Sequence, residues 1–262
     1  MDIITRNFFR LLRSGALHED ETIEPMSSFK WERLGQMVHA QHVEDIAMLG
    51  IDMHKDKEWM NIPEDFSLQD GKTAAIGTQS LSNGFLSRRY RKVRYNELHS
   101  FDTNVGSLDV LNIIVNTTSM MLNKGMMLRG ILTLGSYLRN KGDKVDFLKL
   151  NTMLDKLHLH RMAQLQGSML IAVFHFEKDE LPFVDRIEPS AYNLVVRSVL
   201  HTASDTAEEW HFKQNRSGFV TNNSTLLRRN LRRSLRYLIY APLETVSNYF
   251  SNFARSLQEI EE

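Results

Sequence analysis

Two pairs of histidines are spaced so that their imidazole rings could share a metal ion. His39 and His42 lie three residues apart, which suits one face of a helix, while His158 and His160 lie two apart, which suits a strand or a corner. Neither pair has a third ligand in register, because the two acids that follow His42 project from other sides of the helix, and no H-E-x-x-H pattern occurs. We therefore predict capping or surface histidines, with no metal site and no cofactor.

The sequence Gly71-Lys72-Thr73 has the order of residues with which a phosphate-binding loop ends. The complete motif needs an earlier glycine at the position that Phe66 occupies, and no apolar strand precedes it. We interpret these residues as a plain turn.

A third pattern is Gly167-Ser168 followed by Glu177 and Asp179. Polymerase-beta-like nucleotidyltransferases place a Gly-Ser turn before paired acids, which hold the two metal ions that activate the attacking oxygen and the leaving phosphate. The intervening residues here continue a helical periodicity from Leu159, and a helix would scatter these groups. We interpret the match as coincidence.

The elements that would position these side chains are organised around residues 145–176. Leu150 and Leu154 belong to one helical face, and the apolar residues from Leu159 onward form a second face in a different phase. The change of phase predicts two helices that meet at a corner near His158 and whose apolar faces form the centre of the core.

Helical periodicity extends over most of the chain. It predicts further helices over residues 2–16, 28–49, 87–101, 108–122, 126–138, 191–203 and 226–240, and a last helix that begins at Pro242. Gly15 and Gly50 are interpreted as helix stops. Strand-like alternation is scarce, so the fold class expected is all-α, a multi-helix orthogonal bundle with little or no sheet.

Three regions are expected along the chain. Residues 1–105 form an N-terminal helical region with a loop-rich segment over 51–84, residues 106–222 form the central helical core, and residues 223–262 form basic amphipathic helices packed on that core. A chain of 262 residues is long enough to bury such a core.

Composition excludes several classes of protein. The chain has no cysteine, which rules out a disulfide scaffold, a cysteine nucleophile and thiolate metal sites, and which fits a cytoplasmic location. Lys plus Arg and Asp plus Glu are equal at 32 each, so net charge indicates no specific nucleic-acid partner. We expect no signal peptide and no transmembrane segment, because no apolar run has the necessary length.

The segment from 226 to 240 carries leucines within one arc of about 80° and arginines within a separate arc of about 140°, at 100° per residue. The arginines are Arg228, Arg229, Arg232, Arg233 and Arg236, and the leucines are Leu227, Leu231, Leu235 and Leu238. In one interpretation the leucines dock on the domain and the arginines are a solvated face. In the other, the arginines bind an anionic lipid surface, a phosphorylated sugar or an acidic partner protein.

The central and C-terminal parts of the chain carry short motifs that are shared with a bacterial family. The motifs are Leu128-Arg129, the turn Gly142-Asp143, the helical set Arg161, Gln164 and Gly167, the corner from Asp179 to Phe183, and the basic segment over residues 226–246. In these motifs the chain resembles the helical parts of bacterial uncharacterised nucleotidyltransferase-like proteins that are associated with polysaccharide gene clusters. The resemblance covers residues 108–260, and more loosely residues 7–50.

The family's catalytic core is the part that the sequence lacks. Members with that core carry a Gly-x-Asp-x-Asp-type metal motif, whereas residues 60–107 contain Asp65, Asp70, Glu97 and Asp102 but no closely paired carboxylates on a strand. The resemblance therefore implies a non-catalytic helical interaction protein with no catalytic residues, whose partner is another protein, for example an enzyme of polysaccharide synthesis. The alternatives are a metal-dependent nucleotidyltransferase with a cryptic site and a peripheral binder of anionic surfaces.

Overall fold

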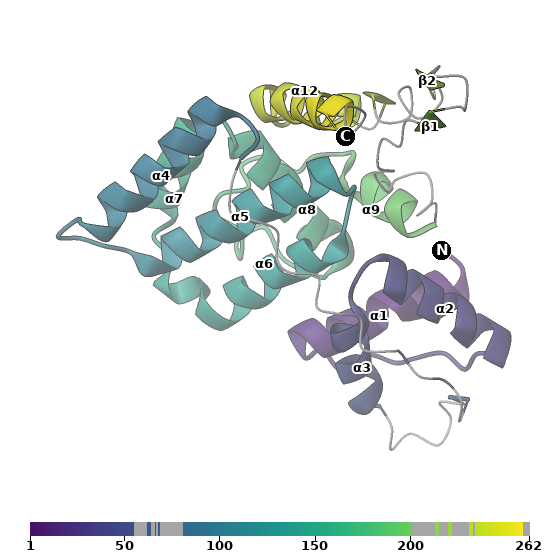
Figure 1. Cartoon of the computed structure of the whole chain (residues 1–262). Helices are drawn as coiled ribbons and strands as arrows, with labels where there is room; N and C mark the ends of the chain where they lie inside the picture. Colours follow the sequence, from purple (N-terminus) through teal and green to yellow (C-terminus); the bar gives the residue numbers. More distant parts are fainter. Residues whose placement is uncertain are drawn as a thin grey trace.

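The computed structural model describes residues 1–54, 62, 63, 66, 68, 81–200, 213, 214, 220, 221, 231, 232 and 234–258, and the side chains of these residues except those of the short strands and of 254–258. This part of the chain is all-α, as expected (Figure 1). Its sheet structure is one antiparallel pair of two-residue strands, β1 (Lys213–Gln214) and β2 (Val220–Thr221). Apolar residues from α1 as far as Tyr240 belong to one continuous core.

The N-terminal helices are α1 (Ile3–Leu17), α2 (Ser28–Ala40) and α3 (Glu44–Asp52). The single helix expected over residues 28–49 is therefore wrong, because the chain breaks at His42, where φ is 52°. The two glycines interpreted as stops are also inside helices. A Cβ on Gly15 would lie 1.9 Å from the carbonyl oxygen of Ile46, and one on Gly50 would lie 2.2 Å from that of Leu11. These glycines let the backbones of α1 and α3 cross in contact.

The central helices are α4 (Gly84–Leu98), α5 (Val105–Asn123), α6 (Leu128–Lys141), α7 (Phe147–Lys156), α8 (His160–Val173) and α9 (Ala191–Leu200), with a 3-10 turn, η1 (Gly142–Lys144), before α7. The two-helix arrangement expected over residues 145–176 is confirmed. Asp146 caps α7 through a bond from the Lys149 N–H, and the corner falls at His158. Leu150 and Leu154 are fully buried, so this face lies in the core.

Four helices end at a histidine in the left-handed backbone conformation. His18, His42, His158 and His175 follow α1, α2, α7 and α8, with φ between 52° and 57°. Glycine is the usual residue at such positions, because a side chain is disfavoured at positive φ. The histidines thus act as helix terminators.

Helix α5 is the one helix among the described residues that is long and apolar enough to cross a membrane. Of its most apolar window, 72% is buried inside the structure. Burial of this kind is typical of a core helix, and α6, α7 and α8 pack around it. The expectation that no segment has sufficient length is therefore wrong for α5, although the absence of a membrane span stays a prediction.

The last helix, α12, extends over Pro242–Gln258, so the predicted start at Pro242 is confirmed. It lies against α5 at one edge of the bundle (Figure 1). Over residues 242–253, the side chains of α12 that are buried are polar: Glu244, Thr245 and Asn248 are each at most 3% exposed. The core therefore meets the polar face of this helix.

Candidate functional site

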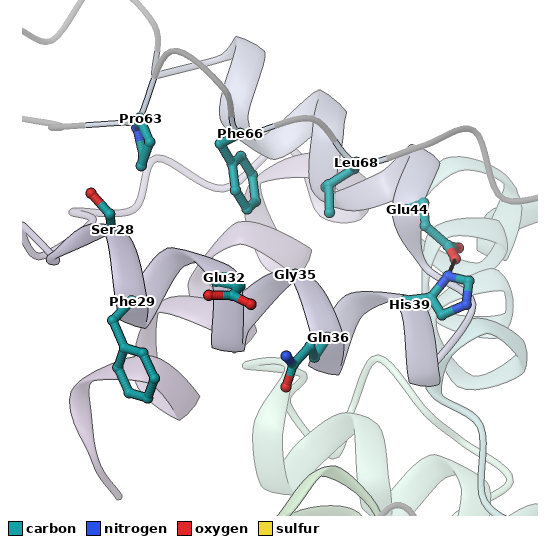
Figure 2. A pocket seen from close by; sticks show the side chains of 10 residues that line it. All are labelled: Ser28, Phe29, Glu32, Gly35, Gln36, His39, Glu44, Pro63, Phe66 and Leu68. Carbon is teal, nitrogen blue, oxygen red and sulfur yellow. Dashed lines mark hydrogen bonds and ion pairs between the residues drawn. The ribbon is translucent and has the colours of Figure 1, made fainter.

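A cleft of about 660 Å³ lies between α2 and residues 63, 66 and 68. Figure 2 shows Ser28 and Phe29 at one end of the cleft and an ion pair between His39 and Glu44 at the other. Along α2 the cleft follows one face of the helix. The residues that line it are Ser28, Phe29, Glu32, Gly35, Gln36, His39, Glu44, Pro63, Phe66 and Leu68.

The roof of the cleft packs on α2 through one aromatic contact. The Phe66 ring lies 5.2 Å from the ring of Trp31, between centroids. Gly35 leaves room for this ring, since a Cβ there would come within 3.3 Å of it. The cleft therefore has an apolar wall opposite the polar side chains of α2.

The His39 and Glu44 pair is the part of this cleft with acid–base character. His39 Nδ1 lies 2.9 Å from Glu44 Oε1; the carboxylate side chain is 8% exposed and the imidazole side chain 76% exposed. Glu44 was expected to point away from this histidine, and it does not, because α3 starts after a break and turns its first residue back toward α2. A carboxylate that orients an imidazole is the geometry of a general base.

Among the described residues that line the cleft, none brings a nucleophile within reach of this histidine. Ser28 lies eleven positions before His39 on the same helix, or about 16 Å along the axis. A hydroxyl at that separation cannot give its proton to the imidazole. Among the described lining residues, His39 therefore has no hydroxyl that it could deprotonate. In the sequence, His42 is the possible second metal ligand beside His39. The centroids of the two rings lie 6.3 Å apart, and His42 lies just after α2 in the left-handed conformation.

A cluster that sequence reasoning missed is formed by Glu19, Glu21 and His175, whose ligand atoms lie within 4.8 Å of one another. Two arginines already neutralise these acids. Arg13 Nε lies 2.5 Å from Glu21 Oε1, and Arg139 Nη1 lies 2.6 Å from Glu19 Oε1. The guanidinium groups would repel a cation, so the cluster is an ion-pair network that ties α1 to α6 and to the end of α8.

The second histidine pair, His158 and His160, makes polar contacts with nearby side chains. His158 Nε2 lies 3.3 Å from Arg89 Nη1, whereas His160 contacts Asp155 at 3.3 Å and Asp185 at 3.2 Å. The two rings therefore have different partners, and within the described residues neither belongs to a set of three ligand atoms close enough to hold a metal ion.

The Gly-Ser pattern is a packing feature, as expected. Gly167 lies inside α8, where a Cβ would come within 2.4 Å of Val184. The Ser168 hydroxyl donates to the Gln164 carbonyl at 2.7 Å and accepts from the Glu188 N–H at 2.9 Å. The acids Glu177 and Asp179 are exposed beyond the end of α8. Ser168 is buried and its hydroxyl makes two hydrogen bonds, so it cannot bind a nucleotide together with these exposed acids.

Two separated acids of the region 60–107 do converge, but on a lysine. Lys149 Nζ lies 3.4 Å from Glu97 and 2.8 Å from Asp102 Oδ2. A hydrogen bond to the Asp102 carboxylate, and a smaller contribution from the one to Glu97, raise the pKa of Lys149. Asp65, Asp70 and the Gly71-Lys72-Thr73 turn lie outside the described residues.

The C-terminal part presents apolar side chains to solvent. Leu243, Val246 and Phe250 of α12 are 46%, 45% and 63% exposed, and Ile239 just before the helix is 57% exposed. We call these four residues the C-terminal seam. Within α12 they lie within an arc of about 60°, and the buried polar face is centred about 180° away at 100° per residue.

No family model matches the chain, and searches of curated proteins and of solved structures found no match. The resemblance to nucleotidyltransferase-like proteins thus stays a prediction.

The basic segment before α12 differs in part from the docking interpretation. Leu231 and Leu235, expected to face the domain, are 41% and 52% exposed. The side chains buried in their place are Tyr237 and Tyr240, whose rings fill more space than the leucines do. Of the five arginines, Arg232 is exposed and Arg236 half-buried, while the other three lie outside the described residues.

The apolar spacing of the C-terminal seam is visible in the sequence, but its exposure is not. Its residues and Phe253 recur at intervals of four and three, which is the a/d spacing of a helix–helix seam. The missing information was which face of α12 meets the core, since an apolar face is normally assigned to the interior.

Proposed function

We propose that this chain is a non-catalytic helical interaction protein, and that the C-terminal seam is its contact surface for an apolar helix of a partner protein. The observation that carries the proposal is the orientation of α12. Glu244, Thr245 and Asn248 face the core, so that Leu243, Val246 and Phe250 face solvent.

Hydrogen bonds hold α12 in this orientation. The Glu244 carboxylate accepts from the backbone N–H groups of Ser82 and of Asn83, the latter at 3.0 Å. The Asn248 amide donates to Asn123 Oδ1 at 2.7 Å. Rotating the helix to bury its seam would leave these polar groups unpaired, which costs about 1–3 kcal/mol for each.

The width of the seam favours a protein helix over other occupants. An arc of about 60° corresponds to the narrow a/d seam of paired helices, whereas a helix that packs broadly on a core or enters a lipid interface has an apolar stripe of about 100° or more. A partner helix with its own a/d residues fits such a surface.

A non-catalytic role is supported by the acidic and histidine side chains described above, which are either held in ion pairs or lack a reaction partner. Glu21 pairs with Arg13, and Glu97 and Asp102 pair with Lys149. His39 is an exposed imidazole with a carboxylate behind it, and none of the described residues that line its cleft brings a nucleophile within reach. The resemblance stated above makes an enzyme of cell-surface polysaccharide synthesis the first partner to test.

The test begins with capture from the native cell, using the wild type and the variants Phe250→Glu and Leu148→Glu. Leu148 is 81% exposed on α7 and serves as the matched control, because the same charge is introduced away from the seam. Each captured protein is then purified and titrated into the chain by calorimetry. Direct binding that is lost in Phe250→Glu and kept in Leu148→Glu supports the proposal; binding that both variants keep contradicts it.

A second candidate is peripheral binding to an anionic surface. The exposure of Leu231 and Leu235 beside Arg232 favours it, because exposed apolar side chains next to cations suit a lipid interface. Each such arginine near an anionic membrane contributes about 1 kcal/mol.

A further inference from the structure

Resting on the proposed function, we infer that the partner helix is α12 of a second copy of this chain, paired antiparallel across a two-fold axis near Val246. A two-fold contact uses the same surface on both partners, so the surface must be complementary to itself. The C-terminal seam meets this requirement in shape, in charge and in direction.

The shape of the seam is self-complementary. A two-fold axis near Val246 brings Leu243 of one copy opposite Phe250 of the other, at both ends of the contact. A smaller aliphatic side chain thus faces a larger aromatic one, and the two valines lie together at the axis. Large and small side chains that alternate in this way fill the space between two helices without voids.

The flanks of the seam carry no charge. In the heptad frame set by Leu243 and Val246, the adjacent described positions are Pro242, Ser247 and Tyr249. Flanking positions usually decide which helices pair, because like charges there repel. Two copies of this helix therefore meet without electrostatic repulsion along the contact.

The ends of the helix determine the direction. The sequence that precedes α12 is basic, with Arg232, Arg236 and three further arginines, whereas residues 255–262 contain Arg255 and three glutamates and so carry a net charge of −2. An antiparallel pair places the basic end of one copy at the acidic end of the other, and a parallel pair places like charges together. The helix dipoles also favour the antiparallel arrangement.

The C-terminal seam can meet a second copy because hydrogen bonds attach the opposite face of α12 to the domain. Asn83 Nδ2 donates to Ser247 Oγ at 2.7 Å, and Asn248 Nδ2 donates to Ser82 Oγ at 3.0 Å. These bonds add to those of Glu244 described above. Helix α12 is therefore already helical and oriented over about 25 Å before association, with no need to refold.

The experiment is sedimentation velocity on the full chain over a range of concentrations. The expected result is a reversible dimer whose dissociation constant rises at least about 30-fold in Phe250→Lys and in Leu243→Glu, the effect of losing an interface hot spot. The control Leu148→Glu should dimerise like the wild type. Thermal melts of each variant at low concentration confirm that the monomer is folded.

Mixing the two seam variants tests the direction. In the antiparallel pair, Glu at position 243 of one copy faces Lys at position 250 of the other, so an equimolar mixture of Leu243→Glu and Phe250→Lys should form a heterodimer. In a parallel pair these side chains lie apart, and no rescue occurs. Failure of the mixture to associate while the wild type dimerises contradicts the antiparallel arrangement.

Two other results overturn the inference. A wild type that stays monomeric at all concentrations excludes the second copy, as does a dimer that the seam variants leave intact. Binding of the monomer to vesicles of phosphatidylcholine and phosphatidylglycerol, lost in Phe250→Lys, would assign the seam to lipid. The two proposals can be told apart: a monomer that still binds an identified protein through the seam keeps the proposed function without the dimer.

Discussion

The crossing of α1 and α3 allows one prediction to be worked in detail. In Gly15→Ala, the new Cβ would lie 1.9 Å from the Ile46 carbonyl oxygen, where ordinary contact begins at 3.4 Å. The clash is with backbone, so no side chain can rotate away from it. The two helices must separate by about 1.5 Å, and a gap of even about 1 Å removes up to half of the dispersion energy of each contact.

The magnitude follows from what this interface buries. Phe8, Leu11 and Ala47 are fully buried at or beside the crossing. Overpacking of such an interface costs about 3 kcal/mol or more, and the helix propensity of alanine returns about 1 kcal/mol. We expect a net loss of at least about 2 kcal/mol in the free energy of unfolding, or a melting temperature lower by about 4–8 °C for a chain of this size.

The assay is thermal unfolding followed by circular dichroism, with Gly84→Ala as the control. Gly84 is the first residue of α4, and a Cβ there meets nothing within 4 Å. That variant should be as stable as the wild type or more stable by up to about 1 kcal/mol. A Gly15→Ala protein that melts at or above the wild-type temperature would refute the role assigned to this glycine.

Four further outcomes are expected. Leu154→Asp places an unpaired charge at a fully buried position and should lower the free energy of unfolding by about 4 kcal/mol in urea titrations; normal melting would show that this face is exposed. Hydrogen bonds from Arg6, and then from Arg10, lower the pKa of Glu24 from 4.5 to about 2. Its contribution to stability is therefore present above pH 4.5 and is lost as pH falls toward 2, so Glu24→Gln should weaken this part of the acid sensitivity. Nucleoside triphosphates should release no pyrophosphate with magnesium, and release that depends on Glu177 and Asp179 would revive the nucleotidyltransferase alternative. In co-sedimentation with anionic vesicles at two salt concentrations, changing the five arginines of residues 228–236 to Gln should abolish any binding seen at low salt, and equal sedimentation would remove the membrane interpretation.

Sequence patterns predicted the parts of the fold that depend on apolar periodicity. The corner at His158 was visible because the apolar face changes phase there, and the start of α12 was visible because Pro242 suits the first turn of a helix. The break at His42 was not visible, because a histidine at positive φ has no compositional signal that distinguishes it from one inside a helix.

The candidate site was harder to predict. Gly15 was read as a stop because the contact that requires it, with the backbone of α3, lies thirty residues away in the chain. The seam was missed because the orientation of α12 depends on its neighbours, Ser82, Asn83 and Asn123, which supply hydrogen-bond partners in place of an apolar groove. Local patterns contain no information about such distant partners.

The polar attachment of α12 has a consequence for the way the protein opens. Detaching a helix held by Glu244 and Asn248 exposes little apolar surface, so the step should have a small denaturant m-value and a small change in heat capacity. In native-state hydrogen exchange, the amides of α12 should then exchange through a local opening whose free energy hardly changes with urea, well before the global unfolding that controls α5 and α8. Hydrophobic stabilisation of apolar contacts increases on warming from low temperature, whereas the hydrogen bonds of this attachment only weaken. Helix α12 should therefore be the first helix to leave the bundle.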